Sequence, residues 1–192
     1  MQTFLNYFNK TRVDNKELDK KHYDFLCGAM EKILELNSNE DIDYALCDLV
    51  VILSSTFYMI DSNNKGKKVY VNETIKKCPL IQKQGFWVGL TKFELNEEIQ
   101  GKSKVEDTLK EQTLTEEKLN NSKMAKMMSV SYNIMQFVSD SNLFNKIIYD
   151  IFKYCNINKE NREIIIGMIE AQIEADTSKG LVLNKSLLMN GK

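Results

Sequence analysis

Histidine, arginine and proline are scarce in this chain of 192 residues, and the scarcity of histidine limits its chemistry. His22 is the only histidine, which excludes a site with two imidazole ligands, including the paired Glu-x-x-His ligands of di-iron bundles. Cys27 lies five residues after His22 on a predicted helix, about 140° away around the helix axis, so the two side chains do not form a nucleophile and base pair. The sequence therefore offers no histidine-based metal or catalytic site.

The glycine-containing motifs of common enzymes are also missing. None of the eight glycines lies in a GxxxxGKS/T loop, a GxGxxG turn or a GxSxG elbow, so the chain lacks the usual phosphate cradle and oxyanion geometry. Glu170 and Glu174 share a helical face, but a solvated charged face is the ordinary reason for that pattern. We therefore predict a protein that is not an enzyme and that holds no cofactor and no metal.

Neither sign of charge dominates the chain. The 26 Lys and Arg residues oppose 27 Asp and Glu residues, a formal net charge of -1, so we predict no nucleic-acid partner. Only Arg12 and Arg162 are arginines, although arginine is the usual residue for bidentate binding of phosphate. The apolar stretch from Met1 to Phe8 is too short for a signal peptide or a membrane span. We expect a cytoplasmic protein without an integral membrane segment.

The cysteines carry no recognisable pattern. Cys27, Cys47, Cys78 and Cys155 are scattered, lie in largely apolar surroundings and include no CxxC pair of the kind found in zinc or redox sites. Free cysteine is among the residues most often buried, so we predict four reduced core residues.

Apolar residues recur at three- and four-residue spacing along most of the chain, as in helices with one buried face. With 43% hydrophobic residues the chain can bury a sizeable core. We predict an all-α fold, a single-domain bundle of six or seven helices. This helical domain spans 17–177, between an N-terminal extension at 1–16 and a C-terminal tail at 178–192. The leucines of the tail predict that it packs on the helical domain and is not frayed.

A long charged segment interrupts the helical domain. Residues 101–112 have almost no large apolar side chains, which is typical of a linker or an exposed helix extension. They join the halves 17–100 and 113–177, and neither half has enough apolar surface of its own to be called independent.

The first half contains the most apolar segment. Residues 42–60 are apolar almost all round, which predicts one central helix. The polar stretch 61–68 predicts a solvated loop, and Val69 to Val71 form a short extended piece at most. The residues predicted to lie deepest in the core are Leu46, Leu49, Val50, Leu53 and Phe57.

Aromatic residues bracket a basic loop in the segment 56–87, the densest unusual feature of the sequence. Tyrosine and tryptophan contribute much of the energy at interaction hot spots, whereas aromatic residues in general dominate core burial, so both interpretations stay open. The candidate partner-binding residues are Tyr58, Lys65, Lys67, Lys68, Tyr70 and Trp87.

The same segment carries a family resemblance. The stretch Leu53 to Tyr58, the turn with Gly66, Val69 to Val71, and then Ile75, Pro79 and Phe86-Trp87 resemble the helical domain of the SET-binding-factor pseudophosphatases, which are myotubularin-related proteins that also carry a DENN module. The later helix from Ala125 to Phe137 is also similar, so the likeness covers roughly Asp41 to Ile173. The resemblance implies a setting in membrane traffic and small-GTPase signalling. In the family, guanine-nucleotide exchange on Rab GTPases is attributed to the DENN module. This chain is too short to contain that module in addition to the helical domain.

Three hypotheses for function follow. The first is a non-catalytic helical protein-interaction or regulatory module, whose partner is another protein. The second is a direct regulator of a small GTPase, with Arg162 as a candidate arginine finger or with the Lys65 to Lys68 loop as the contact. The third is a lipid or small-molecule carrier, because nine methionines and nine phenylalanines are of the kind that line an adaptable pocket.

Overall fold

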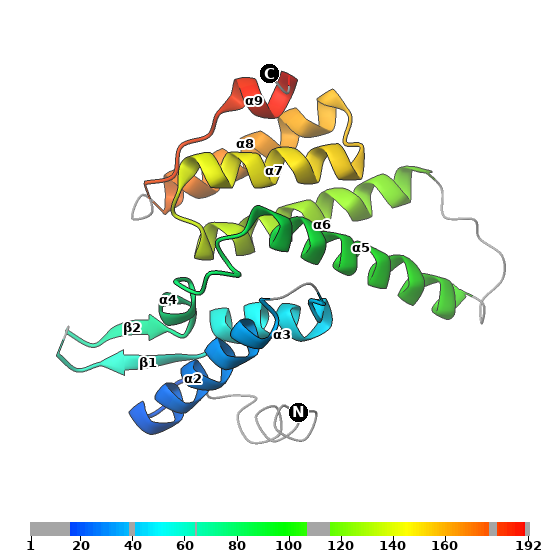
Figure 1. Cartoon of the computed structure of the whole chain (residues 1–192). Helices are drawn as coiled ribbons and strands as arrows, with labels where there is room; N and C mark the ends of the chain where they lie inside the picture. Colours follow the sequence, from blue (N-terminus) through cyan, green and yellow to red (C-terminus); the bar gives the residue numbers. More distant parts are fainter. Residues whose placement is uncertain (1–15, 39–40, 64, 107–115, 177–179, 191–192) are drawn as a thin grey trace. The chain divides into compact units, whose positions relative to one another are not determined.

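The structure is a computed structural model. It describes residues 16–38, 41–63, 65–106, 116–176 and 180–190, and side chains are described outside 97–122. These residues form helices α2 to α9 and one two-stranded sheet, which confirms the predicted all-α class (Figure 1). The chain divides into two compact units, which are treated one at a time: unit 1 is Met1–Leu80 and unit 2 is Ile81–Lys192.

The division between the units falls directly after Leu80, whereas the sequence suggested halves on either side of residues 101–112. Helix α5 (Gln84–Glu106) runs through the first part of that charged segment, and residues 107–112 lie outside the described residues. Most of the predicted N-terminal extension, residues 1–15, also lies outside them.

The described part of unit 1 combines two long helices with a hairpin and one short helix. Aspartates begin both long helices: the Asp19 carboxylate accepts a hydrogen bond from the backbone N–H of His22, and Asp43 accepts one from Leu46. Such side chains satisfy backbone donors that a helix leaves free at its first turn. The elements are α2 (Lys20–Leu36), α3 (Tyr44–Thr56), β1 (Tyr58–Asp61), β2 (Lys67–Tyr70) and α4 (Asn72–Ile75).

Helix α3 is shorter than the sequence predicted. It ends at Thr56, and Phe57 has an extended backbone that leads into β1, so the predicted single helix over 42–60 is wrong in its last turn. The segment after it is also not a simple loop, because residues 58–61 and 67–70 pair as strands. Aromatic and β-branched residues favour such pleated, half-buried positions.

The buried face of α3 also differs from the prediction. Val50 and Phe57 are buried as predicted, whereas Leu46, Leu49 and Leu53 are only half-buried. A helix that is apolar almost all round does not indicate in its sequence which face packs. The buried residues of this helix are Cys47, Val50, Val51 and Ser54.

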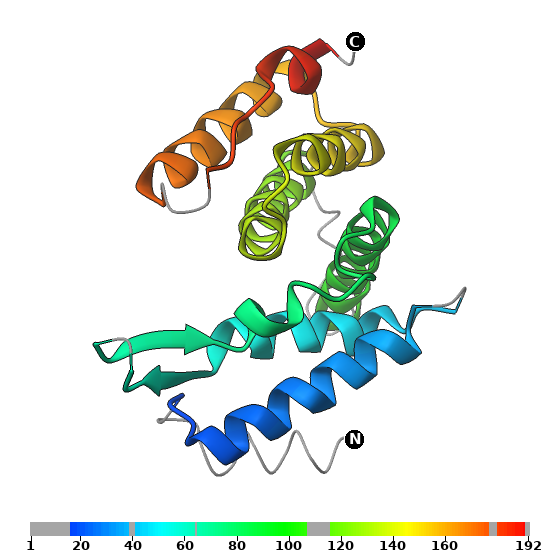
Figure 2. The same ribbon diagram turned by 60° about the vertical axis from the view of Figure 1, so that its left-hand side comes forward.

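In unit 2 the described residues form a bundle of four longer helices and one short C-terminal helix (Figures 1 and 2). Asp140 and Asn158 cap the second pair of long helices through the backbone N–H groups of Leu143 and Asn161. Helix α5 packs on α6 and α7, and α6 also packs on α8. The helices are α5, α6 (Glu116–Phe137), α7 (Ser141–Cys155), α8 (Lys159–Ala175) and α9 (Lys185–Asn190).

The described part of the C-terminal tail docks on this bundle. Leu181 and Leu188 are buried, and α9 packs on both α7 and α8. The Asn145 side chain holds the connection, since its Nδ2 donates to the Val182 carbonyl at 2.8 Å and its Oδ1 accepts from the Asn184 N–H at 2.7 Å. Residues 180–190 are therefore part of unit 2.

An ion pair joins α5 to α6 within unit 2. The nearly buried carboxylate of Glu94 lies 2.5 Å from the Lys126 ammonium.

No helix among the described ranges is both long and apolar enough to cross a membrane.

Candidate functional site

The basic loop of the sequence is the tip of an antiparallel hairpin. Strands β1 and β2 pair Tyr58 with Tyr70 and Ile60 with Lys68 in register. At the turn, Lys65 and Gly66 have φ values of 51° and 72°, in the left-handed region that glycine adopts without strain. The two strands are thus held at a fixed register, which assigns each side chain to one face of the ribbon.

One face of this hairpin gathers two aromatic rings and a cation. The Tyr58 and Tyr70 ring centroids are 5.3 Å apart at an interplanar angle of 55°, and the Lys68 Nζ lies 4.3 Å from the Tyr58 centroid. A cation at that distance is attracted to the ring face. We call Tyr58, Ile60, Lys68 and Tyr70 the hairpin face. Its rings and Ile60 are half-buried and Lys68 is exposed.

The three lysines do not form one patch. Lys67 alternates with Lys68 along β2 and therefore points to the opposite face, where its register partner is Asp61. Lys65 lies in the turn, so only Lys68 shares a face with the two tyrosines. The sequence grouped these residues together, and the register separates them.

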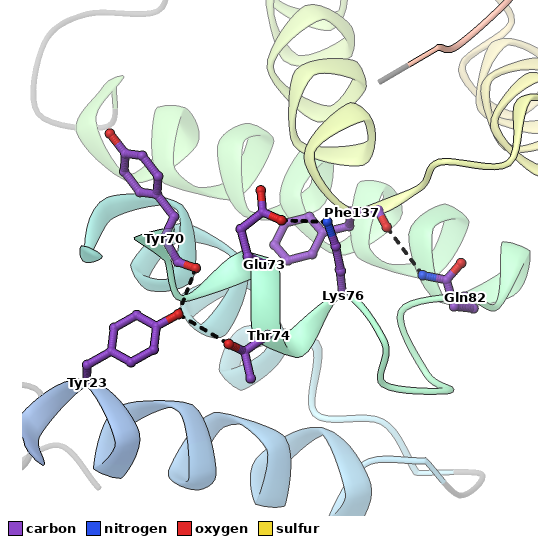
Figure 3. A network of polar contacts seen from close by, with 7 residues as sticks. All are labelled: Tyr23, Tyr70, Glu73, Thr74, Lys76, Gln82 and Phe137. Atoms are coloured by element: carbon purple, nitrogen blue, oxygen red, sulfur yellow. Dashed lines mark hydrogen bonds and ion pairs between the residues drawn. The ribbon is translucent and has the colours of Figure 1, made fainter. Parts of the chain in front are cut away.

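The base of the hairpin is tied to the body of unit 1. Figure 3 shows the Tyr23 hydroxyl of α2 between the Tyr70 carbonyl, to which it donates at 3.1 Å, and the Thr74 hydroxyl at 3.2 Å. Burial raises the pKa of Tyr23 to about 12, so its phenol stays protonated at neutral pH and keeps its donor. On the other strand, the Tyr58 N–H donates to the Lys16 carbonyl at 3.1 Å. Tyr23 thus positions one end of the hairpin face.

Trp87 does not belong to an accessible face, which corrects its assignment as a partner-binding residue. The side chain is 0% exposed, and its Nε1 donates to the Ile81 carbonyl at 2.8 Å. Its ring contacts Phe86 at 5.1 Å and Phe137 at 5.6 Å between centroids. The indole therefore lies in the core of unit 2, and of the two interpretations of the aromatics the core applies here.

Arg162, the candidate arginine finger, is engaged within its own chain. Its Nε donates to the Ile157 carbonyl at 2.9 Å and its Nη1 to the Leu188 carbonyl at 3.4 Å. The guanidinium carbon also lies 5.6 Å from the centroid of Phe152. These contacts fix the start of α8 to α9, and the GTPase role of this residue stays a prediction.

The four cysteines and His22 are the remaining candidate reactive groups, and they lie at buried or half-buried positions or at a helix cap. Burial raises the pKa of the Cys47 and Cys155 thiols to about 11 and raises the pKa values of Cys27 and Cys78, so these thiols are protonated at neutral pH and are weak nucleophiles. Three of the four are buried as predicted, and Cys78 is half-buried. The His22 Nδ1 lies 2.6 Å from the capping carboxylate of Asp19.

Metal ligands are not gathered in the part of the chain that the structure describes. No group of three His, Cys, Asp or Glu side chains there is arranged to hold a metal ion.

Comparison with known proteins gives no relative of this chain. No family model matches it, and neither a curated protein nor a solved structure is significantly similar. The resemblance to the helical domain of the SET-binding-factor pseudophosphatases therefore remains a prediction from its sequence.

Two residues of the site were missed by the sequence analysis. Ile60 was assigned to a helix, and Tyr23 was not singled out. The signal for the hairpin was present, because a turn-forming Asn-Asn-Lys-Gly run lies between the apolar runs Tyr58 to Ile60 and Val69 to Val71. No comparable signal marked Tyr23, whose partners Tyr70 and Thr74 lie 47 and 51 residues away.

Proposed function

We propose that the protein is a non-catalytic helical interaction module and that its hairpin face binds a partner protein with an acidic contact surface. The observation that carries the proposal is the Lys68 ammonium over the Tyr58 ring, beside Tyr70, on a ribbon whose residues are all half-buried or exposed. Tyrosine offers a large amphipathic contact at little conformational cost, since it has two side-chain torsions. Lys68 supplies the charge that selects an acidic partner.

The form of the hairpin favours binding over a purely structural role. A two-stranded ribbon is only marginally stable without a hydrophobic face packed on something else. Here the strand residues of both faces keep partial exposure, while Tyr23 and the Lys16 backbone hold the base in place. A ribbon held at its base loses little conformational freedom on binding, which favours affinity.

The cellular setting is part of the same proposal. We place the module in the cytoplasm, because its free cysteines suit a reducing compartment. Membrane traffic and small-GTPase signalling are the setting that the family resemblance implies. The acidic partner is on this view a component of that machinery.

Lys68→Glu tests the proposal, with Lys67→Glu as a matched control one residue away on the opposite face. Reversing the charge at Lys68 should lower the amount of specific partner captured from the native cell extract roughly tenfold, equivalent to about 1.4 kcal/mol. Lys67→Glu should leave capture within about twofold, although it faces Asp61 and costs up to about 1 kcal/mol of stability.

Capture is quantified by mass spectrometry against wild-type protein, and the thermal midpoint of each variant shows that it is folded. Equal loss with both variants would point to general charge rather than to the hairpin face. Unchanged capture with Lys68→Glu would remove this face from the function.

A further inference from the structure

Helix α8 has an outer face that the described residues of unit 2 leave exposed. Ile164 and Met168 are 44% and 50% exposed, and Ala171 and Ala175 are also exposed. At 100° per residue these four positions fall within about 60° around the helix axis, so they form one apolar stripe. The helix lies along the edge of its bundle, with α9 beside it (Figure 2). We call these four residues the α8 stripe.

A row of carboxylates runs alongside the α8 stripe. Glu160, Glu163 and Glu174 are exposed, and the same geometry places them within about 60° of one another on one side of the stripe. Glu170, further round the helix, is paired with Lys185 of α9 at 2.7 Å. The outer face of α8 is therefore apolar along one side and negatively charged along the other.

Gly167 falls within the arc of the glutamate row, about 40° around the helix axis from the edge of the α8 stripe, and the fold itself does not require it. An added Cβ would meet nothing within 4 Å, and the residue is in the middle of a 17-residue helix. Glycine in a helix interior makes the helix less stable than alanine does. A residue without a side chain does, however, allow a second backbone to approach closely, as at packed helix pairs.

We propose that the outer face of α8 binds an amphipathic helix of a partner protein that carries basic residues along one edge. The partner backbone crosses over Gly167, its apolar residues contact the α8 stripe, and its lysines or arginines lie against Glu160, Glu163 and Glu174. Helix recognition of this kind uses anchors spaced three and four residues apart, which matches the spacing of the stripe. This surface and its partner are independent of the hairpin face.

The negative charge of the glutamate row favours a basic helix over two other binding partners for this face. A second copy of α8 packed antiparallel across a two-fold axis would set one glutamate row against the other, and like charges repel. An anionic lipid surface would meet the same carboxylates, whereas interfacial helices carry lysine and arginine on their polar side. A basic helix is the occupant whose charge complements the row.

The test uses two synthetic amphipathic peptides of 17 residues, the length of α8, with one identical Leu and Ala face. One peptide carries lysines along the polar edge and the other carries glutamates, and fluorescence anisotropy measures their binding to the full chain. Wild-type protein should bind the lysine peptide at least tenfold more tightly than the glutamate peptide. The double variant Glu163→Lys/Glu174→Lys should reverse that preference.

Gly167→Leu separates binding from folding. Leucine is the better helix former and its Cβ meets nothing within 4 Å, so the thermal midpoint should not fall. Its side chain blocks the approach of a second backbone and should weaken binding of the lysine peptide at least tenfold. Met168→Asp should weaken it similarly. Val182→Asp is the control, because Val182 is 67% exposed in the same unit and its backbone is hydrogen-bonded to Ser141 and Asn145 of α7, and it should leave affinity unchanged.

Several results would overturn the proposal. One is no binding of the lysine peptide below about 0.1 mM, and another is binding that Gly167→Leu and Met168→Asp leave intact. A dimer in sedimentation that Met168→Asp dissociates would assign the face to self-association. Flotation with phosphatidylserine vesicles that Met168→Asp abolishes would assign it to a lipid surface.

Discussion

Trp87→Ala should lower the free energy of unfolding of unit 2 by about 3 to 5 kcal/mol, the range for truncating a buried tryptophan or phenylalanine. The loss has two parts. The indole is 0% exposed between Phe86 and Phe137, so its removal leaves a cavity that α5 and α6 close only partly. Its Nε1 also donates to the Ile81 carbonyl, which loses its donor.

Urea unfolding followed by circular dichroism measures this loss, with Tyr132→Ala as the control. Tyr132 is on α6 and 47% exposed, so its truncation should change stability by about 0.5 kcal/mol or less. A loss below about 1 kcal/mol for Trp87→Ala would contradict its place in the core and return it to the candidate partner-binding residues.

Tyr23→Phe should lower the free energy of unfolding by about 1 to 3 kcal/mol, because the ring volume is kept and only the hydroxyl is lost. The Tyr70 carbonyl then lacks the donor that now lies at 3.1 Å, and the Thr74 hydroxyl loses its neighbour at 3.2 Å. The hairpin thereby loses one of the hydrogen bonds that hold its base on unit 1. Hydrogen exchange at the β2 amides should therefore quicken, and capture of a partner by the hairpin face should weaken.

The Tyr23 phenol also gives this variant a pH signature. Burial raises the pKa of Tyr23 from 10.0 to about 12, so the unfolded chain loses the proton first as pH rises. The stabilisation is fully present below pH 10 and is lost between pH 10 and 12, where the gap between wild type and Tyr23→Phe should narrow. A gap that stays constant through this range would contradict the buried, hydrogen-bonded phenol.

The helices were largely predictable because their signals are local. Apolar residues at three- and four-residue spacing predicted helices along most of the chain, and in α2 such residues, Leu26, Met30 and Leu34, are buried. Packing of the C-terminal tail was predicted for a similar reason, because its leucines lie close together in the sequence. Leu188 is buried, as this prediction requires.

The errors arose where distant parts of the chain decide the outcome. Residues 58–60 continue the apolar run of α3, and although a turn-forming run follows them, it is their pairing with β2 that makes them a strand. Trp87 is buried against Phe137, fifty positions later in the sequence, so no local pattern reveals its environment. Lys67 and Lys68 are neighbours in sequence, and strand register alone places them on opposite faces.

The most direct test of the central claim is photo-crosslinking from the two sides of the hairpin in living cells. A benzoylphenylalanine replaces either Ile60, on the hairpin face opposite Lys68, or Met59, on the other face opposite Val69. Both residues are half-buried on the same strand, so the two variants differ only in the face that they report on. The account predicts a crosslinked partner protein from position 60 that is absent from position 59. No crosslink from position 60, or the same products from both positions, would contradict it.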